Sequence, residues 1–218
     1  MEAELRIIQQ SDWISIVIFL SILLMVIAKQ LFQSRFLNFI ILPFNNKYIA
    51  LYSKKDKMLH GFHIMFTGFQ LLNTALYIYL IYDVLIGHQS TSGVLEYGLI
   101  MGILVVFILI KALLQLANGF VFNNIQTIAD FVYKKHTYLN YSGLVMLLSN
   151  ISLTYIFKGS EPVVYISLFL ILLINIIGLI TTLKYHQKLI SSYFFYFILY
   201  LCALEIAPII LIATYLKF

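Results

Sequence analysis

Charged residues and cysteine are both scarce in this chain of 218 residues. Asp, Glu, Lys and Arg make up 11% of the sequence, whereas a soluble globular protein carries about 25%. The only cysteine, Cys202, excludes a disulfide bond within the chain and is most simply interpreted as a packing residue. The sequence also contains no phosphate-binding loop, no nucleophile elbow and no zinc-protease helix, so no common catalytic signature identifies a reaction.

Apolar residues dominate instead, in long uninterrupted runs. They make up 62% of the chain and give a mean hydropathy of +0.95, which the core of a soluble domain cannot explain. A helix needs about 20 apolar residues to cross a bilayer, whereas membrane strands would alternate in character. We therefore predict an all-α integral membrane protein, a single polytopic domain over residues 1–218 with cytoplasmic interfacial amphipathic helices. Its six predicted transmembrane helices cover about residues 13–33, 62–84, 97–119, 142–157, 162–183 and 191–216.

The basic residues predict how the chain is oriented in the membrane. Alternate loops, at 34–61, 120–141 and 184–190, hold nine of the twelve Lys and Arg residues that lie outside the predicted spans. Because loops rich in Lys and Arg stay in the cytoplasm, we expect these three loops inside and both termini outside. The net charge of +5 then follows from topology, and we expect no nucleic-acid partner.

Two of the cytoplasmic loops have the pattern of helices that lie in the membrane interface. In residues 123–135, Ile125, Ile128 and Val132 share one face, while polar residues take the other. We predict a helix parallel to the membrane here, with these three side chains toward lipid or toward the bundle. The loop at 34–61 combines aromatic residues with a cluster of lysines, which would meet anionic headgroups. Membrane lipids are therefore the first expected partners.

One carboxylate lies deep within a predicted span. Glu205 is the only charged residue between Leu189 and Leu216, and a charge at that depth costs about 2.5–3.5 kcal/mol. Its ordinary role is an interhelical hydrogen bond or ion pair, and its functional alternative is the binding of a cation, a proton or a polar ligand. Lys111, the only basic residue well inside a span, is the predicted partner, unless its side chain extends to the cytoplasmic interface.

Other polar residues within the spans suit either interhelical hydrogen bonds or a polar translocation path. They are Asn73, Asn150 and Asn175, with Gln70 and Gln115 nearer the inner ends. Four histidines fall near the cytoplasmic face and are candidate ligands for a metal ion or haem: His60, His63, His136 and His186. No carboxylate or cysteine accompanies them at a recognisable ligand spacing, so we predict no metal site and no cofactor.

Two stretches of the chain resemble a known family. Residues 44–48 with 52–60 read FNNKY and YSKKDKMLH, and residues 194–208 read FFYFILYLCALEIAP. They are similar to the family called domain of unknown function 4271, and the resemblance covers nearly the whole chain. It implies a multi-pass protein of the inner membrane of Gram-negative Bacteroidota, so that the outer termini would be periplasmic. The resemblance brings no known activity and therefore assigns no catalytic residue.

Three functions fit these features. The first is a non-enzymatic subunit that scaffolds or regulates a cell-envelope complex, with other inner-membrane or cell-envelope proteins as partners. Short outer loops and few ionisable groups in the spans favour it. The second is a small proton-coupled transporter centred on Glu205 and Lys111. The third is an enzyme acting on a lipid or haem-like substrate at the cytoplasmic face, through the histidines and the interfacial helices.

Overall fold

The computed structural model describes residues 12–43, 45, 47–52, 60–86, 93–121 and 125–185. These residues form helices and their connections, with no strand among them. In chain order they are α1 (Asp12–Leu31), α2 (Gln33–Ile40), α3 (Lys47–Tyr52), α4 (Gly61–Ile86), α5 (Gly93–Val121), α6 (Ile125–Ile151), the π-helical turn η1 (Ser152–Ile156) and α7 (Glu161–Tyr185). The predicted all-α class is confirmed for this part of the chain. The sixth predicted span, 191–216, lies outside it.

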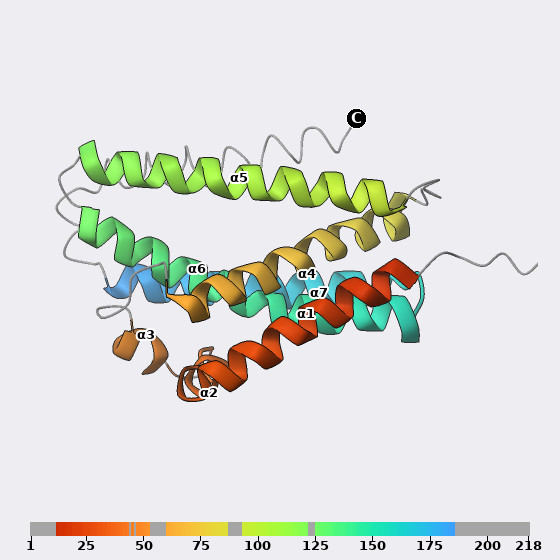
Figure 1. The fold of residues 1–218 in the computed structure, drawn as a ribbon, viewed down its shortest axis with the longest axis horizontal. Helices are drawn as coiled ribbons and strands as arrows, with labels where there is room; N and C mark the ends of the chain where they lie inside the picture. Colours follow the sequence, from red (N-terminus) through yellow and green to blue (C-terminus); the bar gives the residue numbers. More distant parts are fainter. Residues whose placement is uncertain are drawn as a thin grey trace, which may run out of the picture.

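The five long helices run back and forth along the longest axis of the molecule (Figure 1). The ends of α1, α5 and α7, the beginnings of α4 and α6, and the short helices α2 and α3 gather at one end of the bundle. The opposite end holds the beginnings of α1, α5 and α7 and the ends of α4 and α6. This alternation brings the predicted loops 34–61 and 120–141 to the same end of the bundle.

Four of these helices are long and apolar enough to cross a membrane. They are Asp12–Leu31, Gly61–Leu85, Gly93–Leu114 and Glu161–Lys184. They overlap the first, second, third and fifth spans predicted from the sequence. Their large apolar side chains remain exposed on the outside of the bundle, as lipid requires.

The fourth predicted span needs a correction. The sequence predicts a span at 142–157 that is separate from an interfacial helix at 123–135, whereas the structure has one continuous helix, α6, from Ile125 to Ile151. Several residues expected to form the connection are buried, including Thr137, Tyr138 and Asn140. Their polarity suggested a loop, but they lie inside the bundle, where polar side chains bond to neighbouring helices.

The structure also changes the interpretation of the amphipathic pattern at 123–135. Residues 125–135 are helical, and Val132 is buried in the bundle. The side chains of Ile125 and Ile128 lie outside the described part of the chain. At its other end α6 widens into η1, where the amide of Phe157 donates to the carbonyl of Ser152 at 2.7 Å. The helix therefore stops just before Phe157, the last residue of the predicted span.

Short helices α2 and α3 fold back onto the start of α4 through aromatic rings. The ring centroid of Phe39 lies 4.5 Å from that of Phe66 and 5.7 Å from that of Tyr48. Phe62 lies 4.7 Å from Phe66, and all four rings are buried. Such pairs contribute about 0.5–1.5 kcal/mol each beyond the burial of their area. They fix the first predicted cytoplasmic loop against the bundle.

Two glycines bring α6 close to the helices on either side of it. A Cβ atom at Gly143 would lie 3.2 Å from the Cα of Gln70 in α4. A Cβ atom at Gly178 of α7 would lie 2.6 Å from the Cβ of Tyr138 in α6. Both glycines are buried. Close approach of this kind is how membrane helices gain packing energy without a hydrophobic driving force between them.

Helix α5 is less enclosed than α6. No residue in its apolar stretch Gly93–Leu114 is buried, although the helix contacts both α4 and α6. Large apolar side chains are exposed along its length: Val94, Leu95, Leu99, Ile103, Val106, Phe107, Leu109, Ile110, Leu113 and Leu114. The described part of the chain thus leaves much of α5 uncovered.

Candidate functional site

A stripe of polar side chains runs along one face of α4. His63, Thr67, Gln70, Thr74 and Tyr77 recur at three- and four-residue intervals, which places them above one another on a helix. This face meets a polar face of α6. We call their contact the α4–α6 seam, which comprises His63, Thr67, Gln70, Asn73 and Thr74 of α4 with Tyr133, His136, Asn140, Gly143 and Asn150 of α6.

Histidine and tyrosine rings meet at the inner end of the seam, the end that carries α2 and α3. The ring centroid of His63 lies 5.1 Å from that of Tyr133 and 5.9 Å from that of His136. The hydroxyl of Tyr133 lies 3.4 Å from the hydroxyl of Tyr48 in α3. The side chains of His63, Tyr133 and Tyr48 are buried. His63 and His136, two of the four histidines considered as candidate ligands, are therefore neighbours.

Carboxamides occupy the middle of the seam. The Asn140 amide nitrogen donates to the hydroxyl of Thr67 at 3.3 Å, and that hydroxyl donates to the carbonyl of His63 at 2.8 Å. One turn further along α4, the Gln70 amide nitrogen donates to the hydroxyl of Thr74 at 3.0 Å. Because Gly143 has no side chain, the backbones of α4 and α6 approach closely beside Gln70.

Two asparagines join the helices toward the outer end. The Asn150 amide nitrogen donates to the backbone carbonyl of Asn73 at 3.1 Å and lies 3.4 Å from its side-chain oxygen. Asn73 in turn donates to the carbonyl of Phe69 at 2.8 Å. Both side chains are almost fully buried. Asn150 and Asn73 thus form a hydrogen-bonded contact between α6 and α4.

Several buried polar atoms of the seam have no hydrogen-bond partner among the described residues. They are Nδ1 of His136, Oδ1 of Asn140, Oε1 of Gln70 and Oδ1 of Asn150. Thr154 lies in η1, one turn beyond Asn150. Its buried hydroxyl also has no hydrogen-bond partner among the described residues. A buried polar atom without a partner costs about 1–3 kcal/mol, so native proteins rarely leave such atoms unsatisfied. Three such atoms on α6, one on α4 and one on η1 suggest that the seam serves a polar ligand.

His136 lies before the predicted span 142–157 and outside the four apolar helices. Burial, followed by the positive charges of Lys135 and Lys111, lowers its pKa from the usual 6.5 to about 4. The imidazole is therefore neutral at pH 7, with one nitrogen that donates and one that accepts. A neutral imidazole with a buried, unpartnered Nδ1 is suited to hydrogen bonding with a small polar ligand.

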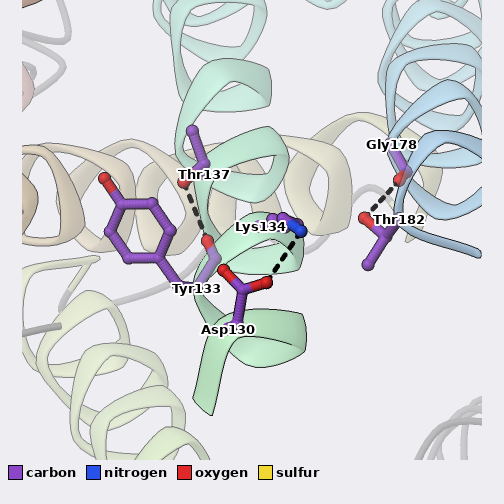
Figure 2. A network of polar contacts seen from close by, with 6 residues as sticks. All are labelled: Asp130, Tyr133, Lys134, Thr137, Gly178 and Thr182. Carbon is purple, nitrogen blue, oxygen red and sulfur yellow. Dashed lines mark hydrogen bonds and ion pairs between the residues drawn. The ribbon is translucent and has the colours of Figure 1, made fainter. Parts of the chain in front are cut away.

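An ion pair lies beside the inner end of the seam, on the side of α6 that faces α7 (Figure 2). The ammonium of Lys134 lies 2.8 Å from Oδ2 of Asp130, four residues earlier. Lys134 is buried and Asp130 is partly exposed, so the charges sit at the edge of the bundle rather than at its centre. Thr182 of α7 lies opposite and donates to the carbonyl of Gly178 at 2.7 Å.

Of the remaining predicted residues, Lys111 of α5 lies close enough to His136 for its charge to lower the pKa of that imidazole, and the others that the structure describes lie away from the seam. His60 packs its ring against Phe32, and Asn175 donates to Ile171 in its own helix. The ammonium of Lys111 lies 5.9 Å from the ring centroid of Phe107. Glu205 and His186 lie outside the described residues, as does the side chain of Gln115. Among the described residues, no group of three or more His, Cys, Asp or Glu side chains is placed to hold a metal ion.

Several seam residues were absent from the prediction, namely Thr67, Thr74, Tyr133 and Asn140. Their signal was available in the sequence as the polar spacing of α4, where every third or fourth residue from His63 to Tyr77 can form hydrogen bonds. In a span, such a stripe marks the face that points into the bundle. The histidines and asparagines alone do not reveal this face, because the threonines between them complete its periodicity.

The bundle, its apolar surface and its polar interior define an all-helical protein with helices able to cross a membrane. Residues 14–216 match the family model of the domain of unknown function DUF4271, and the chain belongs to that family. No curated protein and no solved structure matches the chain.

Proposed function

We propose that the protein is a multi-pass subunit of the bacterial inner membrane that scaffolds or regulates a cell-envelope complex. In this proposal six segments cross the membrane. Residues 142–157, which hold the end of α6 and η1, and the segment 191–216 add to the four apolar helices. Both termini are periplasmic, and α2, α3 and the start of α6 lie on the cytoplasmic side. The concentration of basic residues on alternate loops and the alternation of helix ends in Figure 1 support this topology.

The observation that carries the scaffold role is a glycine face on α5. Gly98 and Gly102 are exposed, and a Cβ atom at either position would meet no described atom within 4 Å. Glycines four residues apart in an apolar helix allow another helix to approach its backbone closely, a common basis of helix association in membranes. Gly143 and Gly178 already serve such contacts inside the bundle. The partner of Gly98 and Gly102 is therefore a transmembrane helix of another protein.

The position of Lys111 supports a partner from another chain. Lys111 follows Gly102 by nine residues, which places it about 180° around the helix at about 100° per residue. If Glu205 pairs with Lys111, the segment 191–216 packs on the Lys111 face of α5. The glycine face then stays available to a second protein.

The test is purification of the tagged protein from native membranes, with Gly98→Leu/Gly102→Leu as the altered form. The unmodified protein should retain a stoichiometric membrane-protein partner, and the double variant should lose it without a lower yield of folded protein, because both positions are open. Leu99→Ala/Ile103→Ala is the matched control, since it alters neighbouring exposed positions and should keep the partner. The proposal fails if no partner is retained, or if the glycine double variant retains it.

A proton-coupled transporter is the second candidate. The buried polar atoms of the α4–α6 seam favour it, because a scaffold needs interhelical hydrogen bonds but does not need acceptors without donors.

A further inference from the structure

We propose that the α4–α6 seam binds a file of water molecules and conducts protons along the bundle, with His136 as the residue that takes up and releases the proton at the inner end. This inference does not rest on the scaffold role, since a subunit of a larger complex can also conduct protons. It assigns a ligand class, water and its protonated form, to the buried polar residues between α4 and α6.

The chemistry of the unpartnered atoms identifies the ligand. The side-chain oxygens of Gln70, Asn140 and Asn150 are hydrogen-bond acceptors only, so each requires a donor. Their amide nitrogens are already used in bonds to Thr74, Thr67 and Asn73, which fixes the orientation of each carboxamide. A bound anion would be repelled by such oxygens. Water supplies two donors in the smallest volume, and buried water typically makes about three hydrogen bonds to groups of this kind.

The unpartnered atoms follow one another along the helices. His136 and Asn140 are four residues apart on α6, and Asn140 contacts Thr67, which is one turn from Gln70 on α4. Asn150 contacts Asn73, which is the next turn of α4, and Thr154 follows Asn150 by one turn. From His136 to Thr154 the rise is about 27 Å at about 1.5 Å per residue. The row of atoms thus begins before the proposed span 142–157 and ends near its last residues.

The π-helical turn supports an opening at the outer end. In α-helices a threonine hydroxyl often donates to the carbonyl of the preceding turn, as Thr67 and Thr74 do in α4. Thr154 lies in η1, and its hydroxyl makes no such bond within the described chain. Wide turns of this type occur frequently at functional sites. The hydroxyl of Thr154 is thus available to the last water of the file.

The proton transfer is balanced within the seam. A hydronium ion of the file gives its proton to Nδ1 of neutral His136, and the imidazolium then releases the proton on Nε2 to water at the inner end. Rotation of the ring or return of a proton restores the starting tautomer. The same steps in reverse carry a proton outward, and no other reactant is consumed. Burial, followed by the charges of Lys135 and Lys111, lowers the pKa of His136 and so favours the neutral ring between transfers.

Proton flux into liposomes tests the proposal. The purified full-length protein is reconstituted into vesicles of phosphatidylethanolamine and phosphatidylglycerol that contain a pH-sensitive dye, and a potassium diffusion potential is applied with valinomycin. We expect the internal pH to change at least fivefold faster than in protein-free vesicles. Asn140→Leu should reduce the rate to that of protein-free vesicles, because it removes an acceptor from the middle of the file.

Asn175→Leu is the matched control, since Asn175 bonds within its own helix and lies outside the seam; its flux should equal that of the unmodified protein. Gln70→Met, with a side chain of similar length, is the second seam variant and decides the matter if Asn140→Leu does not fold. A rate no faster than in protein-free vesicles would overturn the proposal, and so would a folded seam variant with unchanged flux. Retention of a partner protein is measured separately, so failure here leaves the scaffold role intact and is distinguishable from its failure.

Discussion

Helices α5 and α6 are neighbours of similar length, yet they differ in what they bury. α6 buries polar side chains, among them Asn140 and Asn150, and its Gly143 packs closely against α4. α5 exposes apolar side chains and two glycines that nothing described covers. In a membrane protein the interior is the place where polar groups find partners, and lipid accepts apolar groups. α6 is therefore the helix that contacts its neighbours through buried polar groups, whereas α5 has an exposed apolar surface.

The largest expected effect concerns the face of α5 opposite to its glycines. If Lys111 pairs with Glu205, then Lys111→Glu alone and Glu205→Lys alone each place like charges together within the membrane. Leaving a buried charge without its partner costs about 3–5 kcal/mol. Either single variant should give little folded protein, and the double variant should restore it, as measured by size-exclusion chromatography of a fluorescent fusion in detergent. If the double variant is no better than the single variants, the two residues are not partners.

The packed and open glycines should respond differently to a methyl group. Gly178→Ala places a Cβ atom against the ring base of Tyr138, which cannot rotate away. Overpacking of this type costs about 1–3 kcal/mol, and we expect the upper part of that range. Gly98→Ala meets open space, and it should leave the protein as stable or slightly more stable. Thermal unfolding midpoints in one detergent compare the two variants, and equal midpoints would contradict the packing of α6 against α7.

The pH dependence of stability should depend on His136 in α6. The folded-state pKa of His136 is about 4, below the usual 6.5, so the unfolded chain binds more protons between these values. Stability should therefore be constant above about pH 6.5 and fall by about 1.4 kcal/mol per pH unit as the pH decreases toward 4. The pH dependence is measured by unfolding the unmodified protein and His136→Gln between pH 7.5 and pH 5 in the same detergent and salt. Parallel pH curves for the two proteins would show that His136 is not buried in neutral form.

The smallest expected effect concerns two asparagines that differ in their hydrogen-bond partners. Asn150→Leu removes a hydrogen bond between α6 and α4, and interhelical bonds of this type contribute about 0.6 kcal/mol on average and about 1.7 kcal/mol at most. Asn175→Leu removes a bond within α7 only and should cost less. Denaturant or thermal unfolding of both variants ranks them, and a greater loss for Asn175→Leu would reverse the assignment of the seam.

Sequence reasoning predicted the helices with continuous apolar runs better than it predicted α6. The spans that α1, α4, α5 and α7 overlap were found because lipid exposure demands a continuous apolar run. α6 was divided into two pieces, because Thr137, Asn140 and Ser142 reduce local hydropathy while serving the interior. Of the seam, Asn73, Asn150, Gln70 and two histidines are candidates from the sequence, whereas Thr67, Thr74 and Asn140 emerge only from the structure. Which α6 residues meet the polar stripe of α4 depends on how the two helices are aligned along their axes. That alignment follows from three-dimensional packing and cannot be read from the pattern of one sequence.

Photo-crosslinking in native membranes tests most directly whether the exposed surface of α5 contacts another protein. A photoreactive residue is placed at Val106, one turn beyond Gly102 on α5, and at Phe169 on α7, which is similarly exposed. The account predicts that position 106 forms a discrete product with a second protein and that position 169 reacts only with lipid. A product that maps to residues 191–216 of the same chain, or identical behaviour at the two positions, would contradict it.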